Sequence, residues 1–209
     1  MINNSNTYNK VFPKTFQKLI DDFTSLPSVG PKMAERLVLH LFKEDKSQVE
    51  NFSNNLKDLV NNLNFCRECH HIAEQGGQCV ICASNQRDRQ TICVAEDPLD
   101  VISIEKTKAY NGLYYVLGGS LSVMSEEEIK KLNFDHLVSR IKDENIKEVI
   151  IATNPTTDGD TTALYLVRIL KDLNVKITRL GRGMPTGGDI EYADEITISS
   201  ALEGRKEMS

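Results

Sequence analysis

Two cysteine pairs constrain this chain more than any other feature of its sequence. Cys66 and Cys69 form one C-x-x-C pair, and after nine intervening residues Cys79 and Cys82 form another. This spacing is typical of structural zinc sites, in which each pair of thiolates supplies half of a tetrahedron. The alternative, two disulfides, needs an oxidising compartment that no feature of the sequence supports. We therefore expect one structural Zn²⁺ ion held by four thiolates.

Three other residues near these pairs could also bind a metal, but we expect different roles for them. His70 and His71 could replace a thiolate, although four well-spaced cysteines leave no vacancy in a tetrahedral site. Cys93 lies in an apolar run, which favours a buried thiol over a ligand. A site closed by four protein ligands is structural rather than catalytic.

Length and composition allow two modules, and together with the helix and strand patterns described below they predict a multidomain α+β protein. With 209 residues, of which 40% are apolar and 26% charged, the chain can build one good core or two small ones. No apolar run reaches membrane-spanning length and the N-terminus has no hydrophobic signal region, which favours a cytoplasmic location without a membrane partner. The net charge is −5, yet the first 43 residues carry six Lys or Arg and three Asp or Glu. The N-terminal module is therefore the better candidate for contact with a polyanion.

Apolar residues recur at helical spacing in three N-terminal segments. This pattern predicts helices at residues 14–24, from Pro31 onwards and at residues 48–63, with a tight turn at residues 26–31, where two prolines and a glycine fall. The second helix has one face that we expect to be buried, made of Met33, Ala34, Leu37, Val38, Leu41 and Phe42. The third helix has an apolar face of its own, made of Val49, Phe52, Leu56, Leu59, Val60 and Leu63.

A helix, a tight glycine turn and a second helix that opens with cations together resemble the helix-hairpin-helix motif. The resemblance implies that N–H groups of the turn grip nucleic-acid phosphates, reinforced by the cations Lys32 and Arg36. It places Ser28 and Gly30 in the turn. The motif usually has glycine where this chain has Ser28, and serine is less free to adopt a positive φ. The alternative is a helical hairpin that only packs.

Apolar strands alternate with amphipathic helices after the cysteines, which predicts a largely parallel sheet covered by helices. A capping box is expected from Ser125 to Glu128. The expected strands are residues 90–95, 113–117, 148–153 and 175–180, and the expected helices are 98–106, 134–144 and 160–173. The residues expected to point inward are Val101 and Ile102, with Ile104 as a further candidate, on the first of these helices, and Ala163, Leu164, Val167 and Leu170 on the last.

Two polar clusters follow strands of this sheet, at the edge where ligands of parallel sheets collect. They lie in the sequences C-V-A-E-D-P-L-D at residues 93–100 and A-T-N-P-T-T-D-G-D at residues 152–160. Both sequences resemble a Toprim domain, the fold shared by topoisomerases, bacterial primases and some nucleases.

The order of the three motifs, together with the tail, is similar to the RecR family of bacterial recombination mediators over residues 12–205. The tail carries G-M-P-T-G-G-D at residues 183–189 and A-L-E-G-R at residues 201–205. The expected parts are a helix-hairpin-helix DNA-binding module at residues 1–62, a zinc finger at 63–88 with its ligands within 66–82, a Toprim domain at 91–186, and a C-terminal assembly segment at 187–209.

Catalytic Toprim domains hold Mg²⁺ with a glutamate after the first strand and an Asp-x-Asp pair after a later one. Glu96 matches the glutamate. When Gly159 is aligned with the glycine of the active pattern, the Asp-x-Asp positions hold Asn154 and Thr156. Two carboxylate ligands are then missing, so the resemblance implies a Toprim domain without catalytic activity.

The remaining acids of this edge need no metal to explain them. Asp158 and Asp160 are expected at the start of the next helix, where capping and attraction to the helix dipole favour carboxylates. Together with Glu96 they form an acidic face that we expect to be a partner surface or a vestigial metal site.

The family resemblance also implies partners. Such proteins bind DNA through its backbone and act with RecO, and in many bacteria with RecF, to load RecA at single-strand gaps, and they assemble into tetrameric rings. Two alternatives stay open from the sequence. One is a Mg²⁺-dependent Toprim nuclease, and the other is a zinc-dependent scaffold that holds protein partners and barely contacts DNA.

Overall fold

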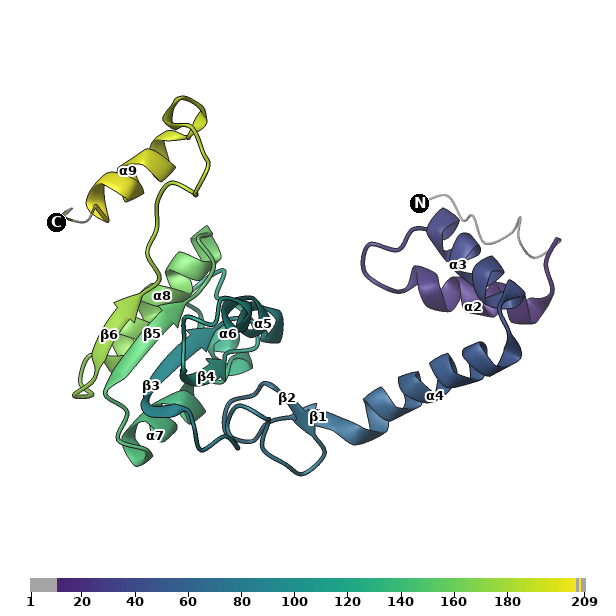
Figure 1. Cartoon of the computed structure of the whole chain (residues 1–209), viewed down its shortest axis with the longest axis horizontal. Helices are drawn as coiled ribbons and strands as arrows, with labels where there is room; N and C mark the ends of the chain where they lie inside the picture. Colours follow the sequence, from purple (N-terminus) through teal and green to yellow (C-terminus); the bar gives the residue numbers. More distant parts are fainter. Residues whose placement is uncertain (1–10, 206, 208–209) are drawn as a thin grey trace. The chain divides into compact units, whose positions relative to one another are not determined.

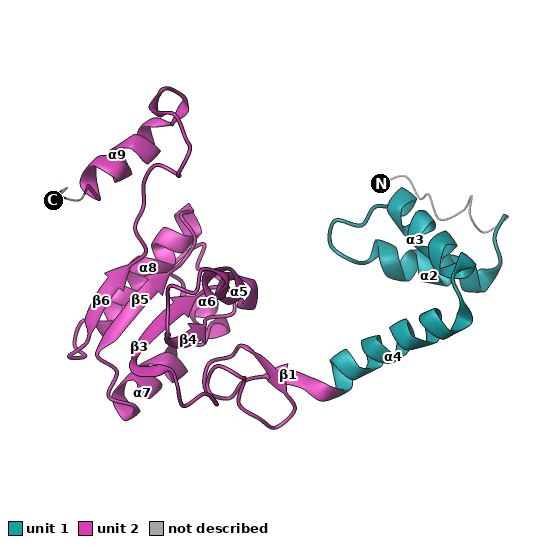
Figure 2. Cartoon of the chain, in the orientation of Figure 1, with its two compact units in different colours: residues 1–61 teal, residues 62–209 magenta. Residues whose placement is uncertain are grey.

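The structure, a computed structural model, describes residues 11–205 and 207. The chain divides into two units, residues 1–61 and residues 62–209 (Figure 2). The first unit is helical, and the second contains the cysteine pairs and a four-stranded parallel sheet. The predicted combination of a helical module with an α/β module is therefore confirmed. Residues 1–10, 206, 208 and 209, which belong to the first and last expected parts, lie outside the described residues.

The first unit is a helical hairpin followed by a long third helix (Figure 1). Gly30, in an extended conformation, precedes α3, and Pro31 occupies the first turn, where its missing N–H group costs nothing. The small core between the first two helices consists of Ile20, Ala34 and Val38, with Phe16, Phe23 and Val29 packed against them. The three helices are α2 (Lys14–Thr24), α3 (Pro31–Lys43) and α4 (Lys46–Asn62).

The apolar faces of this unit are less covered than the sequence predicts. Met33 and Phe42 of α3 are 51% and 77% exposed, so the expectation that both are buried is wrong for the single chain. The helix α4 contains no buried residue, because it leads away from the hairpin instead of packing over it (Figure 1). Its exposed apolar side chains include Phe52, Leu56, Leu59 and Val60.

The second unit is built on a parallel sheet with strand order β4-β3-β5-β6. In register, Val94 of the inner strand β3 lies opposite Tyr115 on one side and Ile151 on the other. The strands of this sheet are β3 (Asp88–Ala95), β4 (Gly112–Val116), β5 (Glu148–Ala152) and β6 (Lys176–Arg179). A separate antiparallel pair, β1 (Leu63–Phe65) and β2 (Ile72–Glu74), precedes it.

The two faces of the sheet pack against different partners, because successive side chains of a strand point to opposite faces. One face, with Ile92 and Val94, packs against α7 and α8 in the larger core. The other face, with Cys93 and Ala95, packs against α5 and the four paired cysteines. The helices of this unit are α5 (Pro98–Lys106), α6 (Glu126–Lys131), α7 (Phe134–Asp143), α8 (Thr157–Leu170) and α9 (Glu195–Glu203), with a 3₁₀ turn η1 (Ile190–Tyr192).

α8 differs from the prediction in its start and in its inward face, whereas α5 has the predicted bounds and differs only in its inward face. α8 begins at Thr157 rather than residue 160, because the Thr156 hydroxyl caps it by accepting a hydrogen bond from the Gly159 amide at 3.1 Å. Ala163 and Leu170 are buried as predicted, but Leu164 and Val167 are exposed and Leu166 is fully buried instead. On α5, Ile102 is 41% exposed and only Val101 of the expected set is fully covered, since a helix this short presents one narrow face to the sheet.

A full capping box forms at α5 rather than at the predicted position. The Asp97 side chain accepts from the Leu99 amide at 2.8 Å, and the Asp100 side chain accepts from the Asp97 amide at 3.0 Å. At α6, Ser125 accepts from the Glu128 amide, but the Glu128 carboxylate binds Lys131 instead of completing the box.

No helix among the described residues is long and apolar enough to cross a membrane.

Candidate metal centre and nucleic-acid interface

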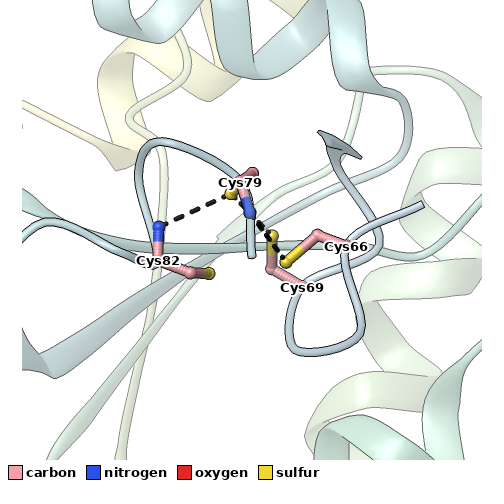
Figure 3. A group of neighbouring side chains, drawn as sticks. All are labelled: Cys66, Cys69, Cys79 and Cys82. Carbon is pink, nitrogen blue, oxygen red and sulfur yellow. Dashed lines mark hydrogen bonds between the residues drawn. The ribbon is translucent and has the colours of Figure 1, made fainter. Parts of the chain in front are cut away.

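The four paired cysteines converge on one buried point (Figure 3). Their sulfur atoms all lie within 4.8 Å of one another, and each residue is 2% exposed or less. Four thiolates at about 2.3 Å from a tetrahedral Zn²⁺ lie about 3.8 Å apart, and the Sγ atoms of Cys69 and Cys79 are 3.5 Å apart. The amides of Cys79 and Cys82 donate to the Sγ atoms of Cys66 and Cys79 at 3.4 and 3.5 Å. The donor set therefore fits a tetrahedral metal.

Turn geometry brings the two pairs together in a compact segment, residues 63–84, which we name the knuckle. The Cys66 amide donates to the His71 carbonyl at 2.7 Å and the His70 amide donates to the Cys66 carbonyl at 2.9 Å, closing the first turn. Gly76, with φ 80°, permits the reversal before the second pair, because a positive φ strains other residues. Short turns on both sides thus aim all four sulfur atoms inward.

The thiols behave differently inside and outside this cluster. Hydrogen bonds from Cys69 and Cys82 hold the pKa of the Cys79 thiol well below its usual range, so the cluster favours at least one thiolate. Cys93 is also buried, as predicted, and burial raises the pKa of its thiol to about 12. It lies in the same apolar core but outside the group of four ligands, so it is an inert thiol at neutral pH.

The knuckle is attached to the open edge of the parallel sheet. The Val116 amide on the edge strand β4 donates to the Cys69 carbonyl at 2.8 Å. His70 packs against Tyr115 and His136, with ring centroids 5.4 and 5.0 Å away. Burial and the neighbouring positive groups lower the pKa of His70, which keeps it neutral at pH 7. The structure thus places His70 in the packing against the sheet.

Arg140 of α7 joins the two sides of this attachment. Its Nη1 donates to the Glu68 carbonyl in the knuckle at 2.8 Å and to the Tyr114 carbonyl on β4 at 3.2 Å. Its Nε donates to the Glu144 carboxylate at 2.9 Å. Burial opposes the charge of Arg140, but Glu144 and the thiols of Cys82 and Cys69 favour it and raise its pKa. Sequence reasoning missed this residue because its contacts lie up to 72 positions away in the chain.

At the carboxyl edge of the parallel sheet, Glu96 follows β3 and is buried beneath the loop that follows β5. Its carboxylate accepts hydrogen bonds from the Asn154 amide at 3.0 Å and from the Asn154 side-chain nitrogen at 2.6 Å. The Thr156 hydroxyl is the N-cap of α8. The two positions that carry metal-binding aspartates in a catalytic Toprim pattern therefore hold a hydrogen-bond donor and a helix cap.

The two aspartates of α8 have separate surroundings. Asp160 binds Arg179 at 2.7 Å and also Arg182, and these bonds, Arg182 foremost, lower the pKa of its carboxyl to about 2. Asp158 and Asp160 both lie in the first turn of α8, as predicted, where the helix dipole attracts carboxylates, but the cap is Thr156, so the capping part of the prediction is wrong. Asp160 lines a pocket of about 630 Å³ with Asn154, Thr156, Arg179 and Arg182, whereas Glu96 and Asp158 do not line it. The three acids of the predicted acidic face therefore do not line one common pocket.

The two arginines of this edge were also missed from the sequence. Arg179 is the last residue of β6, and Arg182 follows it in the segment that leads to α9. Cations at the carboxyl end of a strand could have been noticed, because this is the edge where ligands of parallel sheets bind.

The turn of the helical hairpin presents the four predicted DNA-contact residues on its surface. Ser28 adopts φ 64°, the left-handed conformation that glycine usually provides, and it is exposed. Gly30 is exposed before the N-terminus of α3, and an added Cβ there would meet nothing within 4 Å. Lys32 and Arg36 are exposed one turn apart on α3. Their placement brings two cations beside the turn and the helix N-terminus.

Replacing Cys69 by serine is expected to remove the metal and the soluble yield together. The binding energy of a structural metal site is largely folding energy, and a hydroxyl is a poor zinc ligand. Metal analysis of purified protein should give one zinc per wild-type chain. Cys93→Ser is the matched control, since it changes a buried thiol outside the ligand group and should keep its zinc. A folded wild-type protein without zinc would contradict the assignment.

Replacing Gly159 by alanine is expected to destabilise the second unit by about 2–4 kcal/mol, because overpacking forces the backbone to shift. The new Cβ would overlap the Asn154 carbonyl oxygen and lie 2.9 Å from the Glu96 Oε1 atom. Urea unfolding of the metal-loaded protein measures this change. Gly181→Ala, where an added Cβ meets nothing within 4 Å, should change stability by less than about 0.5 kcal/mol. Equal stability of both variants would show that the loop relaxes freely.

Comparisons with known proteins agree with this architecture. Residues 16–60 match the family model "RecR, helix-hairpin-helix", residues 90–181 match "Toprim domain", and residues 183–206 match "RecR, C-terminal". Two proteins named "Recombination protein RecR", from Staphylococcus saprophyticus and Staphylococcus haemolyticus, are each 46% identical over 197 residues, which cover 94% of this chain and 99% of theirs. With this identity over nearly the full length of both chains, and with the four-cysteine cluster between its helical hairpin and its Toprim domain, the chain belongs to the RecR family.

Proposed function

We propose that this chain is a non-catalytic, DNA-binding recombination mediator that acts in the cytoplasm. In this role it works with RecO, and where present with RecF, to load RecA at single-strand gaps during DNA repair. The observation that carries the non-catalytic part is the pair of hydrogen bonds from Asn154 to the Glu96 carboxylate, at 3.0 and 2.6 Å. The names of the relatives support a role in recombination.

The Glu96–Asn154 bonds argue against a working Mg²⁺ site. Mg²⁺ needs carboxylate or phosphate oxygens in near-octahedral geometry. Here both carboxylate oxygens of Glu96 accept from an amide, and Glu96 is only 8% exposed. An amide nitrogen directed at the carboxylate occupies the place where a cation would have to bind. The edge therefore keeps the Toprim scaffold while its acid is engaged within the protein.

The surface of the helical hairpin supports contact with the phosphate backbone of DNA. Two common reasons for glycine do not apply to Gly30. Its φ is −82°, which any residue adopts, and an added Cβ would meet nothing within 4 Å, so no neighbour excludes a side chain. A close approach of the backbone to a ligand is a third reason for glycine, and the helix N-terminus beside it attracts phosphates. Ser28, Lys32 and Arg36 then supply a hydroxyl and two cations. Contacts of this kind read the backbone and not the base sequence.

Zn²⁺ is the proposed metal of the knuckle, bound by Cys66, Cys69, Cys79 and Cys82. Four thiolates in a closed, buried tetrahedral arrangement are typical of structural zinc. The metal would hold the turns of the knuckle together and would leave no position open for a substrate.

Assembly into a homo-oligomer, a tetrameric ring by family resemblance, is part of this proposal. The exposed apolar side chains on α4 and, at the other end of the chain, Ile196 and Leu202 on α9 support it. Large apolar patches on a protein surface usually mark interaction sites. In this arrangement the four expected parts are a DNA-binding module, a zinc finger, a Toprim domain and an assembly segment.

The double variant Lys32→Glu, Arg36→Glu is expected to weaken DNA binding at least tenfold, equally for unrelated base sequences, because only backbone charge is contacted. Fluorescence anisotropy over a salt series measures both the affinity and its salt dependence, whose slope should fall in magnitude by about 1.5–2. Lys14→Glu with Lys18→Glu is the matched control, with the same change of charge on exposed positions of α2. Unchanged affinity in the first variant would move the DNA site elsewhere, and wild-type affinity without salt dependence would favour a scaffold.

The purified protein is expected to leave supercoiled, linear and gapped DNA intact with Mg²⁺ or Mn²⁺, since one buried glutamate makes a weak dication site. Gel electrophoresis measures this, and the same preparation should accelerate RecA loading in the presence of RecO. Glu96→Ala should bind DNA nearly as the wild type does. A metal-dependent nick that disappears in Glu96→Ala would overturn the mediator assignment in favour of a nuclease.

A further inference from the structure

The junction between the knuckle and the sheet contains a buried arginine with contacts on both sides. The side chain of Arg140 is 3% exposed. One of its nitrogens, Nη1, donates to the carbonyl of Glu68, which precedes the ligand Cys69, and to the carbonyl of Tyr114 on β4. A single guanidinium nitrogen thus ties the turn of the first cysteine pair to the edge strand.

The negative charge of a metal-bound four-thiolate site favours a buried cation beside it, and Arg140 is such a cation. A Zn²⁺ ion with four thiolates carries a net charge of −2, because four negative sulfur atoms outweigh two positive charges. All four cysteines are buried, and a buried charge is unfavourable unless a charge of opposite sign lies nearby. The carbonyl that Arg140 binds belongs to Glu68, the neighbour of the ligand Cys69, so the guanidinium lies beside the first cysteine pair. Its ion-pair partner Glu144 is 27% exposed, and contact with water weakens such a pair.

Other cations near the knuckle are less suited to offset this charge. Arg89 donates to the Cys82 carbonyl at 3.3 Å, but it is exposed, and water and salt screen exposed charges strongly. His70 packs in the junction, but its contacts there are with the rings of Tyr115 and His136. Arg140 combines a full charge, burial and direct hydrogen bonds to both sides of the junction.

We propose that Arg140 is a positioning residue of the metal site, which holds the first cysteine turn against β4 and offsets the negative charge of the metal-bound thiolates. The proposal rests on the zinc assignment made above and goes beyond it, because it couples retention of the metal to a helix of the Toprim domain. Loss of Arg140 should therefore speed the release of zinc even though no ligand has changed.

The test compares zinc release from the full-length wild type with three variants, Arg140→Gln, Arg140→Lys and Arg89→Gln. Zinc-loaded protein is mixed with excess 4-(2-pyridylazo)resorcinol, whose absorbance reports the freed metal, well below the thermal midpoint of each variant. We expect release at least tenfold faster from Arg140→Gln and an intermediate rate from Arg140→Lys, which keeps the charge without the paired hydrogen bonds. Arg89→Gln should stay within twofold of the wild type.

Two further measurements separate this role from a general loss of stability. The Co²⁺-loaded forms should share the visible absorption of a tetrahedral thiolate site, so that the ligand set is intact while its release is faster. The double variant Arg140→Gln, Glu144→Gln removes the carboxylate that the single variant leaves without its partner, and it answers the question if Arg140→Gln does not fold.

The outcomes distinguish this proposal from the zinc assignment. Release from Arg140→Gln and from the double variant within twofold of the wild type overturns the role of Arg140 and leaves the zinc assignment standing. A wild-type protein that carries no metal overturns both. Partial rescue by Arg140→Lys, with an unchanged Co²⁺ spectrum, supports the charge contribution in particular.

Discussion

The hydrogen bond from the Val116 amide to the Cys69 carbonyl joins the knuckle to the open edge of the sheet. Edge strands present N–H groups that need partners, and unprotected edges invite pairing with other chains. Here the knuckle covers part of that edge, and its cysteines lie in the same apolar core as Cys93, Ala95 and Val101. Metal binding and the packing of one face of the sheet therefore depend on each other, although the cysteines and the sheet are separate segments of the sequence.

At the carboxyl edge of the sheet, hydrogen bonds from Asn154 hold the buried acid Glu96. Gly159 lies so close to Asn154 and Glu96 that a side chain there would overlap the loop, so the geometry of an acid-bearing edge is retained. An amide in place of a carboxylate then turns a repulsive pair that would need a cation into a hydrogen-bonded pair that needs none.

Local patterns were the strong part of the sequence analysis. The bounds of α2 follow from apolar periodicity, Pro31 and Pro98 mark the starts of α3 and α5, and the cysteine spacing predicts the cluster. The errors arise where a local signal had a competitor. Thr156 and the two aspartates are all good cap residues, and only the loop after β5 decides that Thr156 is the cap. Leu164 and Leu166 are both apolar, and only the packing of α8 against the sheet decides which of them is buried.

Contacts between distant segments had no signal in the sequence at all. Arg140 reads as one more charged residue on an amphipathic helix, and its two carbonyl partners become visible only once the knuckle and β4 lie beside it. Likewise, Arg179 and Arg182 meet Asp160 across the edge of the sheet. Such contacts depend on topology, which a single sequence with local periodicity does not specify.

The ion pairs of Asp160 have a consequence for how the C-terminal segment is held. Arg182 lies where the chain leaves the sheet toward α9, so its bond to Asp160 fixes the direction in which that segment departs. Both partners are about one third or more exposed, and salt weakens exposed ion pairs. Rising ionic strength is therefore expected to loosen the anchoring of α9. If the hairpin binds DNA as proposed, salt acts on this protein at two separate places, so a salt titration of DNA affinity also needs a readout of the C-terminal segment.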